Sequence, residues 1–290
     1  MMVSIACKVS DLVGEENWAD ALRRRAVAVR RDIAEALYHT GGGHYGGSFS
    51  AVELLLTIYT RHLRIDPARL HDPARDRFVL SKGHAAIGLY AVLRSLGWLE
   101  EPLDSYATFG SPLEGHPDMT AAPWVDWSTG SLGQGLSAAL GMAIGLRRYN
   151  RHVWALLGDG ECQEGQVWEA AMLAGLLKPD NLHVIVDLNR YQEFGWRLAQ
   201  QHASPIEPVP DMAEKWRAFG WDVIECDGHD IEAIDLACSE SMARARPCMI
   251  LAATRKGQGA ALTQSDPARF HCTDVSADEH AAILAGLEQP

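Results

Sequence analysis

The spacing of apolar residues predicts four helices in the first half of the chain. Residues 17–39 place apolar side chains on one helical stripe, with arginines on the opposite face. Further helices are expected at about 50–63, about 83–96 and about 134–148, the last rich in small residues. Each of these helices is therefore expected to bury one face against another layer.

Short apolar runs between the helical segments are predicted to be strands. Near-continuous apolar strands that alternate with helices are typical of a parallel sheet covered on both faces. The predicted fold class is therefore α/β, a doubly wound, mostly parallel sheet with helices on both faces. No repeat or linker interrupts the pattern, so residues 1–290 are predicted to form a single domain. The predicted strands are 77–80, 153–157, 182–188, 221–226 and 248–254.

Composition narrows the function classes. The net charge of −12 argues against nucleic-acid and anionic-membrane partners, which need a basic face. No apolar stretch is long enough to span a bilayer, and the amino end lacks a signal-peptide pattern. The six cysteines include no C-x-x-C pair. We therefore expect a cytoplasmic protein with reduced thiols that acts on small molecules or proteins.

An acidic residue between two glycines, Asp159, directly follows one predicted strand. Ligands of such sheets bind outside the carboxyl ends of the strands. Thirty positions later the next strand ends at Asn189, which a single crossover would place beside Asp159. Carboxylate, amide and main-chain oxygens suit Mg²⁺ or Ca²⁺, and ligand phosphate oxygens would fill the remaining positions. Alternatively, Asp159 only caps the helix that follows.

Several motifs, in order, resemble those of the transketolase family. The spacing from Gly158-Asp159-Gly160 to Asn189 is similar to the thiamine diphosphate fingerprint. The resemblance extends from about Trp18 to His271, and it implies the diphosphate-binding domain of the thiamine diphosphate fold, with thiamine diphosphate and Mg²⁺ (or Ca²⁺) as cofactors. The other motifs are GDGECQEGQVWEAAMLAG, GGGHYGGSFSAVELL, LSKGHAAIGLY, EGHPDMT, STGSLGQGLSAALG and WRAFGWDVIECDGHD.

The resemblance also implies roles for individual residues. His84 and His116 would line the diphosphate and the C1-hydroxyl side of the donor sugar, and His44 the acceptor channel, so these three are the expected catalytic residues. Any one histidine could instead be structural, although His84 and His116 each follow a glycine inside a family motif. The implied metal ligands are Asp159, Asn189 and the main-chain oxygen of Tyr191. The implied cofactor contacts are His84, Gly130, Leu132, Gly158, Asp159, Gly160, Glu164, Asn189 and His271.

A second glycine pattern, at residues 41–46, formally matches G-x-G-x-x-G. It follows a predicted helix, whereas a dinucleotide fingerprint follows a strand, so NAD binding is rejected. Within this segment His44 could simply cap the next helix, and Tyr45 replaces the proline usual in the family.

Other positions also depart from the family pattern. Leu188, Glu193, Phe194 and Cys272 replace its usual residues. The loop beside the cofactor is therefore expected to differ from that of the family, and the sequence does not specify the substrate. It also does not decide between a primary pentose phosphate pathway and a specialised biosynthetic pathway.

The resemblance implies transfer of a two-carbon ketol unit from a ketose (phosphate) to an aldose (phosphate). Transketolases also have a pyrimidine-binding domain, which bears the glutamate that activates the aminopyrimidine, and a C-terminal domain, and neither is matched here. We therefore expect the N-terminal subunit of a split transketolase, inactive alone and completed by a C-terminal partner subunit in a heterotetramer of two copies each. Alternatives are a deoxyxylulose-phosphate synthase-like or keto-acid dehydrogenase component, and a cofactor-free scaffold subunit.

Overall fold

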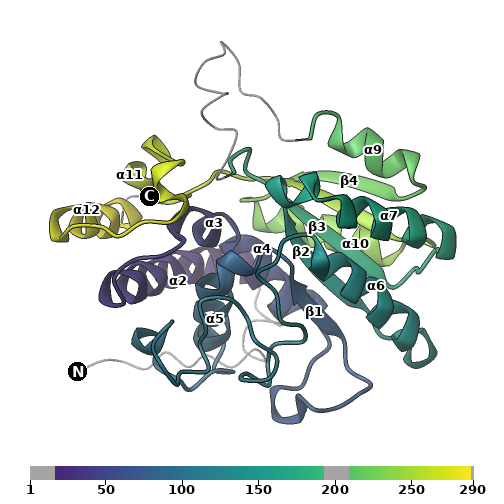
Figure 1. Cartoon of the computed structure of the whole chain (residues 1–290), viewed down its shortest axis with the longest axis horizontal. Coiled ribbons are helices and arrows are strands. Elements are labelled where there is room, and N and C mark those ends of the chain that lie inside the picture. Colours follow the sequence, from purple (N-terminus) through teal and green to yellow (C-terminus); the bar gives the residue numbers. More distant parts are fainter. Residues whose placement is uncertain (1–16, 193–208, 289–290) are drawn as a thin grey trace.

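A computed structural model describes residues 17–192 and 209–288. These residues form a five-stranded sheet with helices on both faces (Figure 1), and every neighbouring pair of strands is parallel. The predicted doubly wound α/β fold is therefore confirmed, and the strand bounds differ from the predicted ones by one residue at most. In spatial order the strands are β1 (Arg77–Leu80), β2 (Val153–Gly158), β3 (Leu182–Leu188), β5 (Cys248–Ala253) and β4 (Asp222–Asp227).

Each central strand contributes to two separate cores. In β2, Trp154 and Leu156 pack into the core on one face, whereas Val153 and Ala155 pack into the core on the other. This division follows from the alternation of side chains along a strand. Burial on both faces explains why the strands are nearly continuous apolar runs.

Helices from distant parts of the chain cover the two faces of the sheet. In Figure 1, α6 and α7 lie side by side over one face, together with α9. The opposite core receives α2, α4, α5 and α10. The helices are α2 (Trp18–His39), α3 (Tyr45–Ser50), α4 (Val52–Thr57), α5 (Ala86–Ser95), α6 (Gln134–Leu146), α7 (Gly165–Leu177), α9 (Met212–Ala218), α10 (Ile231–Met242), α11 (Ala261–Ser265) and α12 (Ala277–Leu287).

The helix expected at about 50–63 is observed as α4 followed directly by a π-helical turn, with the short helix α3 before it. Helix α3 ends before Ala51, α4 begins at Val52, and a π-helical turn follows at Ile58–His62. The helix expected at about 83–96 likewise begins with a 3₁₀ turn, Gly83–Ala85. Such tighter or wider turns are local adjustments to packing that helical periodicity alone does not reveal.

Two further findings concern the described residues. None of their helices is long and apolar enough to cross a membrane. Their five cysteines form no disulfide bond.

Candidate active site at the carboxyl edge of the sheet

The structure brings Asp159 and Asn189 together at the carboxyl ends of β2 and β3, which are paired neighbours. The backbone N–H of Arg190 donates a hydrogen bond to the Asp159 carboxylate. The N–H of Gly160 donates to the other carboxylate oxygen at 2.8 Å, and Asp159 caps the 3₁₀ turn that follows. The capping interpretation and the pairing of the two motif positions are therefore compatible.

The donor set around Asp159 fits a hard divalent cation. Burial, together with the neighbouring Asp187, raises the pKa of Asp159 to about 7. The Asn189 amide donates to Asp187 at 3.2 Å, and its oxygen accepts from the Tyr191 N–H at 3.1 Å. A cation would offset the unfavourable burial of Asp159, and carboxylate, amide and main-chain oxygens are ligands that Mg²⁺ and Ca²⁺ accept. Among the described residues no three His, Cys, Asp or Glu side chains gather as a metal site.

A buried ion pair that sequence reasoning missed lies beside these residues. Asp187 and Lys82 are both fully buried and form a salt bridge. Asp187 also accepts from Ser50 at 2.6 Å and from Thr254. Burial favours a higher pKa for Asp187, but the Lys82 ammonium and these hydrogen bonds lower it overall. The sequence signal that could have revealed this pair is Asp187 inside an apolar strand. A buried charge requires a partner, so a buried cationic side chain could have been expected nearby.

Four predicted histidines form one cluster. The ring centroid of His44 lies 5.4 Å from that of His84, 6.1 Å from His116 and 5.6 Å from His271, and His84 lies 5.5 Å from His271. Burial and nearby cationic groups lower the pKa of His44 to about 4 and that of His271 to about 3, and lower that of His84 as well. The neutral imidazoles of His44, His84 and His271, together with the Lys256 ammonium beside His271, can donate hydrogen bonds to an anion.

Glycines allow this cluster to pack against the chain. A Cβ at Gly47 would lie 2.9 Å from the His84 ring, and one at Gly46 would lie 2.8 Å from Lys256. His44 precedes α3 but forms no side-chain cap, so the capping alternative for His44 is not observed. The pattern at 41–46 follows α2 rather than a strand, which agrees with the rejection of NAD binding.

The loop that carries Gly130 and Leu132 lies against the same edge. Gly130 has a φ of +138°, and a Cβ there would lie 3.1 Å from the His116 ring. Leu132 is half-buried, and Gly158 is buried at the end of β2, where a Cβ would have no atom closer than 3.9 Å. Space beside Gly158, together with Lys256 and the histidines, therefore fits a diphosphate group.

The remaining predicted residues lie around the edge of this site. Glu164 is exposed before α7, and the Tyr191 carbonyl accepts from Lys256 Nζ at 3.4 Å. Lys256 also contacts His271 Nδ1 at 2.6 Å. Leu188 ends β3, and Cys272 is exposed next to His271. Glu193 and Phe194 lie outside the described residues.

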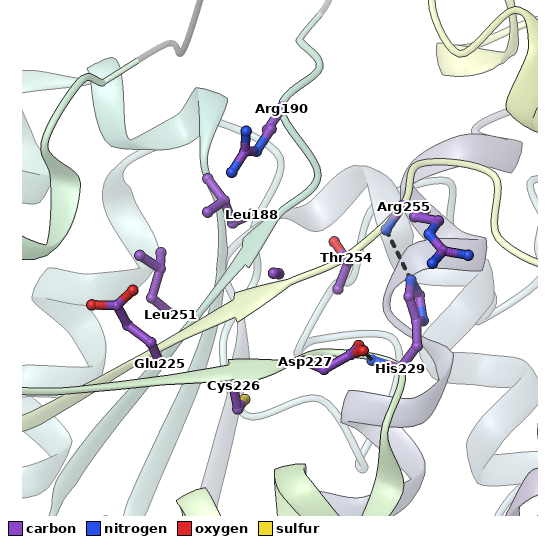
Figure 2. Close-up of a pocket in the computed structure, with 10 residues that line it drawn as sticks. Leu188, Arg190, Glu225, Cys226, Asp227, His229, Leu251, Thr254 and Arg255 are labelled. Atoms are coloured by element: carbon purple, nitrogen blue, oxygen red, sulfur yellow. Dashed lines mark hydrogen bonds between the residues drawn. The ribbon is translucent and has the colours of Figure 1, made fainter.

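A pocket of about 640 Å³ adjoins the site over the ends of β3, β5 and β4 (Figure 2). None of the predicted site residues lines it. Figure 2 shows the His229 ring accepting a 2.8 Å hydrogen bond from the Arg255 N–H. The other ring nitrogen lies 3.1 Å from Glu53, to which it donates. The histidine of the D-G-H-D motif therefore anchors the segment that carries Lys256.

These features define an α/β protein with a histidine-lined site, bordered by Asp159 and Lys256, at the carboxyl edge of a parallel sheet. Residues 22–287 match the family described as "Transketolase, thiamine diphosphate binding domain". The chain therefore belongs to the transketolase family and carries its thiamine diphosphate-binding domain.

Two curated relatives are similar to the chain over nearly their whole length. One is the 6-deoxy-6-sulfo-D-fructose transketolase subunit of Clostridium sp. (strain MSTE9), 40% identical over 272 residues, which cover 92% of this chain and 96% of the relative. The other is a subunit of the apulose-4-phosphate transketolase of Actinobacillus succinogenes, 37% identical over 256 residues, with 87% and 91% covered. The chain is thus an enzyme subunit of the transketolase family.

A solved transketolase has the same fold within a longer chain. The structure of transketolase from Leishmania mexicana superposes with a TM-score of 0.82 at 27% identity, covering 92% of this chain and 41% of that one. The chain therefore spans about two fifths of the solved transketolase chain.

Proposed function

We propose that this chain is the cofactor-binding subunit of a split transketolase, which transfers a two-carbon ketol unit from a ketose to an aldose, either of them phosphorylated. The contact between Asp159 and the backbone at Arg190 carries this proposal, because it joins both halves of the fingerprint at one point. The family match and the two subunit relatives support it.

Three residues would hold the metal in this proposal. Asp159, Asn189 and the Tyr191 carbonyl would bind Mg²⁺ or Ca²⁺, and diphosphate oxygens would complete the coordination. Gly158 and Gly160 allow the backbone to approach the diphosphate. Thiamine diphosphate, when bound, supplies the carbanion chemistry. The protein needs to bind the cofactor, orient the substrate and exchange protons with the substrate oxygens.

The histidine cluster would serve these remaining tasks. His84, His116 and His44 would donate and accept protons through ring nitrogens at substrate oxygens, since their neutral forms present both a donor and an acceptor. His271 would contact the diphosphate, and the half-buried Leu132, with Gly130, would lie against the cofactor ring. Glu164, exposed before α7, would face the cofactor region from the partner side.

An exposed apolar surface on α6 and α7 supports the proposal of a partner subunit. The two helices carry one charged residue between them, Glu169. Helices that are apolar all round are normally covered, and a large exposed apolar patch is typical of an interaction site. We define this surface as the α6–α7 face; its exposed large side chains are Ile144, Met172, Leu173, Leu176 and Leu177.

The partner would supply the pyrimidine-binding and C-terminal domains, and residues 1–290 would act as one diphosphate-binding domain. We place the assembly, two copies of each chain, in the cytoplasm. The relatives' names specify a sulfonated deoxy sugar and a sugar phosphate, which supports a sugar or sugar phosphate as substrate and a specialised pathway.

Calorimetric titration tests the cofactor part of the proposal. Thiamine diphosphate with Mg²⁺ would be titrated into the chain, with and without the polypeptide encoded beside it, and into Asp159→Ala. We expect weak, metal-dependent binding that tightens with the partner and is lost in Asp159→Ala. Absence of binding under every condition would favour the scaffold alternative.

A charge introduced on the α6–α7 face tests the partner part. Leu176 is 76% exposed on α7, and Leu236 is 60% exposed on α10. Leu176→Glu should abolish co-purification with the partner, whereas the matched control Leu236→Glu should leave it intact. Equal behaviour of the two variants would place the partner elsewhere.

A further inference from the structure

A buried carboxylate next to the predicted site is not used by the proposed mechanism. Glu161 is 2% exposed and accepts three hydrogen bonds from three separate segments. One oxygen accepts from the Ser81 hydroxyl at the end of β1 and from the Gly133 N–H at 2.9 Å. The other accepts from the Gly158 N–H at 3.2 Å. None of these donors is charged, so Glu161 is buried without a salt bridge to them, which is costly and therefore informative.

The loop bound by Glu161 is fastened at both ends. At one end the Thr129 hydroxyl donates to the Leu80 carbonyl at 2.7 Å, and at the other the Gly133 N–H donates to Glu161. Gly130 and Leu132, the residues expected to meet the cofactor ring, lie between these two anchor points. Displacement of the loop as a whole therefore requires release of one of them.

Glycines make the approach of this loop possible. Gly133 has a φ of +84°, and a Cβ there would lie 2.7 Å from Glu164 Cβ. A Cβ at Gly135 would collide with the Ser81 hydroxyl. The loop is thus pressed onto the end of β1 and the turn after β2, where one side chain can reach all three donors.

We propose that Glu161 is a positioning residue that fixes residues 129–133 and Gly158 in the relative placement needed to bind the cofactor. This inference rests on the proposed function, because the two parts it connects are those expected to hold the cofactor ring and the diphosphate. A loop that is already fixed in the free protein loses little conformational entropy when the cofactor binds. Fixing the loop therefore strengthens cofactor binding without adding a contact to the cofactor.

Hydrogen exchange on the chain without cofactor tests the mechanical part. Glu161→Gln preserves the side-chain volume but replaces one acceptor oxygen with an NH₂ group, which cannot accept from Gly133 or Gly158. We expect amide exchange at 129–133 or at Gly158 to accelerate by about tenfold or more, because one N–H loses its acceptor. Exchange in β4 should stay unchanged.

Two controls define the specificity of that result. Ser81→Ala removes one donor but leaves both backbone contacts, so its effect should be smaller. Glu240→Gln makes the same substitution at an exposed position of α10 and should change nothing. Unchanged exchange at both Gly133 and Gly158 in Glu161→Gln would overturn the proposal, whether or not the cofactor binds.

Titration of thiamine diphosphate and Mg²⁺ into the chain with its partner tests the functional part. Glu161→Gln should raise Kd by about tenfold, while kcat at saturating cofactor should change less than about twofold. A purely structural role would reduce the folded fraction and hence the titration amplitude, but not Kd. Faster loop exchange with an unchanged Kd would overturn the positioning role. If the wild-type assembly binds no cofactor, the proposed function fails. The hydrogen-exchange experiment still shows whether Glu161 holds Gly133 and Gly158 in place.

Discussion

Two groups of histidines at opposite ends of the same sheet differ in how their ring nitrogens are used. At the amino end, His183 is fully buried and lies 2.6 Å from the Ser241 hydroxyl and 2.8 Å from the His152 ring nitrogen. Its ring stacks on Trp154 at 4.5 Å, and His62 contacts Asp235 at 2.9 Å. These histidines have protein partners and are parts of the core.

At the carboxyl end the rings mainly contact one another. Within the described part of the chain, the rings of His44 and His84 form no hydrogen bond, and His271 is contacted by Lys256. Burial lowers the pKa in both groups, so a shifted pKa does not distinguish them. The unused donors and acceptors do, because half-buried polar groups without protein partners are available for a ligand.

The two groups of histidines should differ most in whether an alanine substitution lowers stability or activity. His183→Ala removes a fully buried ring and its contacts with Ser241 and His152, so the free energy of unfolding should fall by about 2–4 kcal/mol. His84→Ala should cost less than about 1 kcal/mol, yet lower the activity of the assembled enzyme by about 100-fold. Urea unfolding and a ketol-transfer assay measure both. Similar destabilisation by the two variants would remove the distinction between the groups.

Removal of the acid at the carboxyl edge should affect binding rather than folding. Asp159→Ala should weaken metal-dependent binding of thiamine diphosphate by about 100-fold or more. The substitution deletes a proposed metal ligand itself, which should cost more than losing a residue that only orients a ligand. Asp180→Ala, at an exposed position near Arg147, is the matched control and should bind as the wild type does. Retained affinity in Asp159→Ala would show that the metal lies elsewhere.

The amino-end histidines should make stability depend on pH. Burial lowers the pKa of His183 well below its usual value, which is about 6.5 in an unfolded chain. Below that pH the unfolded state binds the proton more readily, so stability is complete above about pH 6.5 and falls as the pH decreases. The contribution of this one group reaches about 1.4 kcal/mol per pH unit.

The corresponding measurement is urea unfolding at about pH 7.5 and about pH 5.5, on either side of the unfolded-state value. His183→Gln should reduce the difference in unfolding free energy between the two conditions. An identical difference in the variant would assign the pH dependence to other groups, including the carboxyl-end histidines.

The smallest expected effect tests how closely the carboxyl-end rings are packed. A Cβ at Gly47 would lie 2.9 Å from His84 Nε2, so Gly47→Ala should displace that ring and weaken cofactor binding by about 3- to 10-fold, or roughly 1 kcal/mol. Gly141→Ala, also in a helix, meets no atom within 4 Å. It should raise stability by up to about 1 kcal/mol and leave cofactor binding to the chain unchanged. Equal affinities in both variants would contradict this packing argument.

Much of the fold was predictable because its signals are local. The central strands β2, β3 and β5 are buried almost throughout, so each is a mainly apolar run, with His183 and Asp187 as polar exceptions in β3. The helix expected at about 50–63 is present as α4 and the π-helical turn Ile58–His62, but the π-helical geometry and the preceding helix α3 (Tyr45–Ser50) were not predicted. Within α3, Gly46 and Gly47 pack against Lys256 and His84, which no local pattern encodes.

The sequence by itself determined the alternation of strands and helices, the family and the positions of the expected ligands, because these depend on residue spacing. Only the tertiary structure decided which buried polar and charged groups meet. Lys82 and Asp187 are 105 positions apart, and Ser81 and Glu161 are 80 positions apart. Their contacts arise because parallel strands bring distant chain segments to one edge of the sheet. Neighbours in space likewise decided whether a histidine is part of the core or available to a ligand, since the residue type is the same at both ends of the sheet.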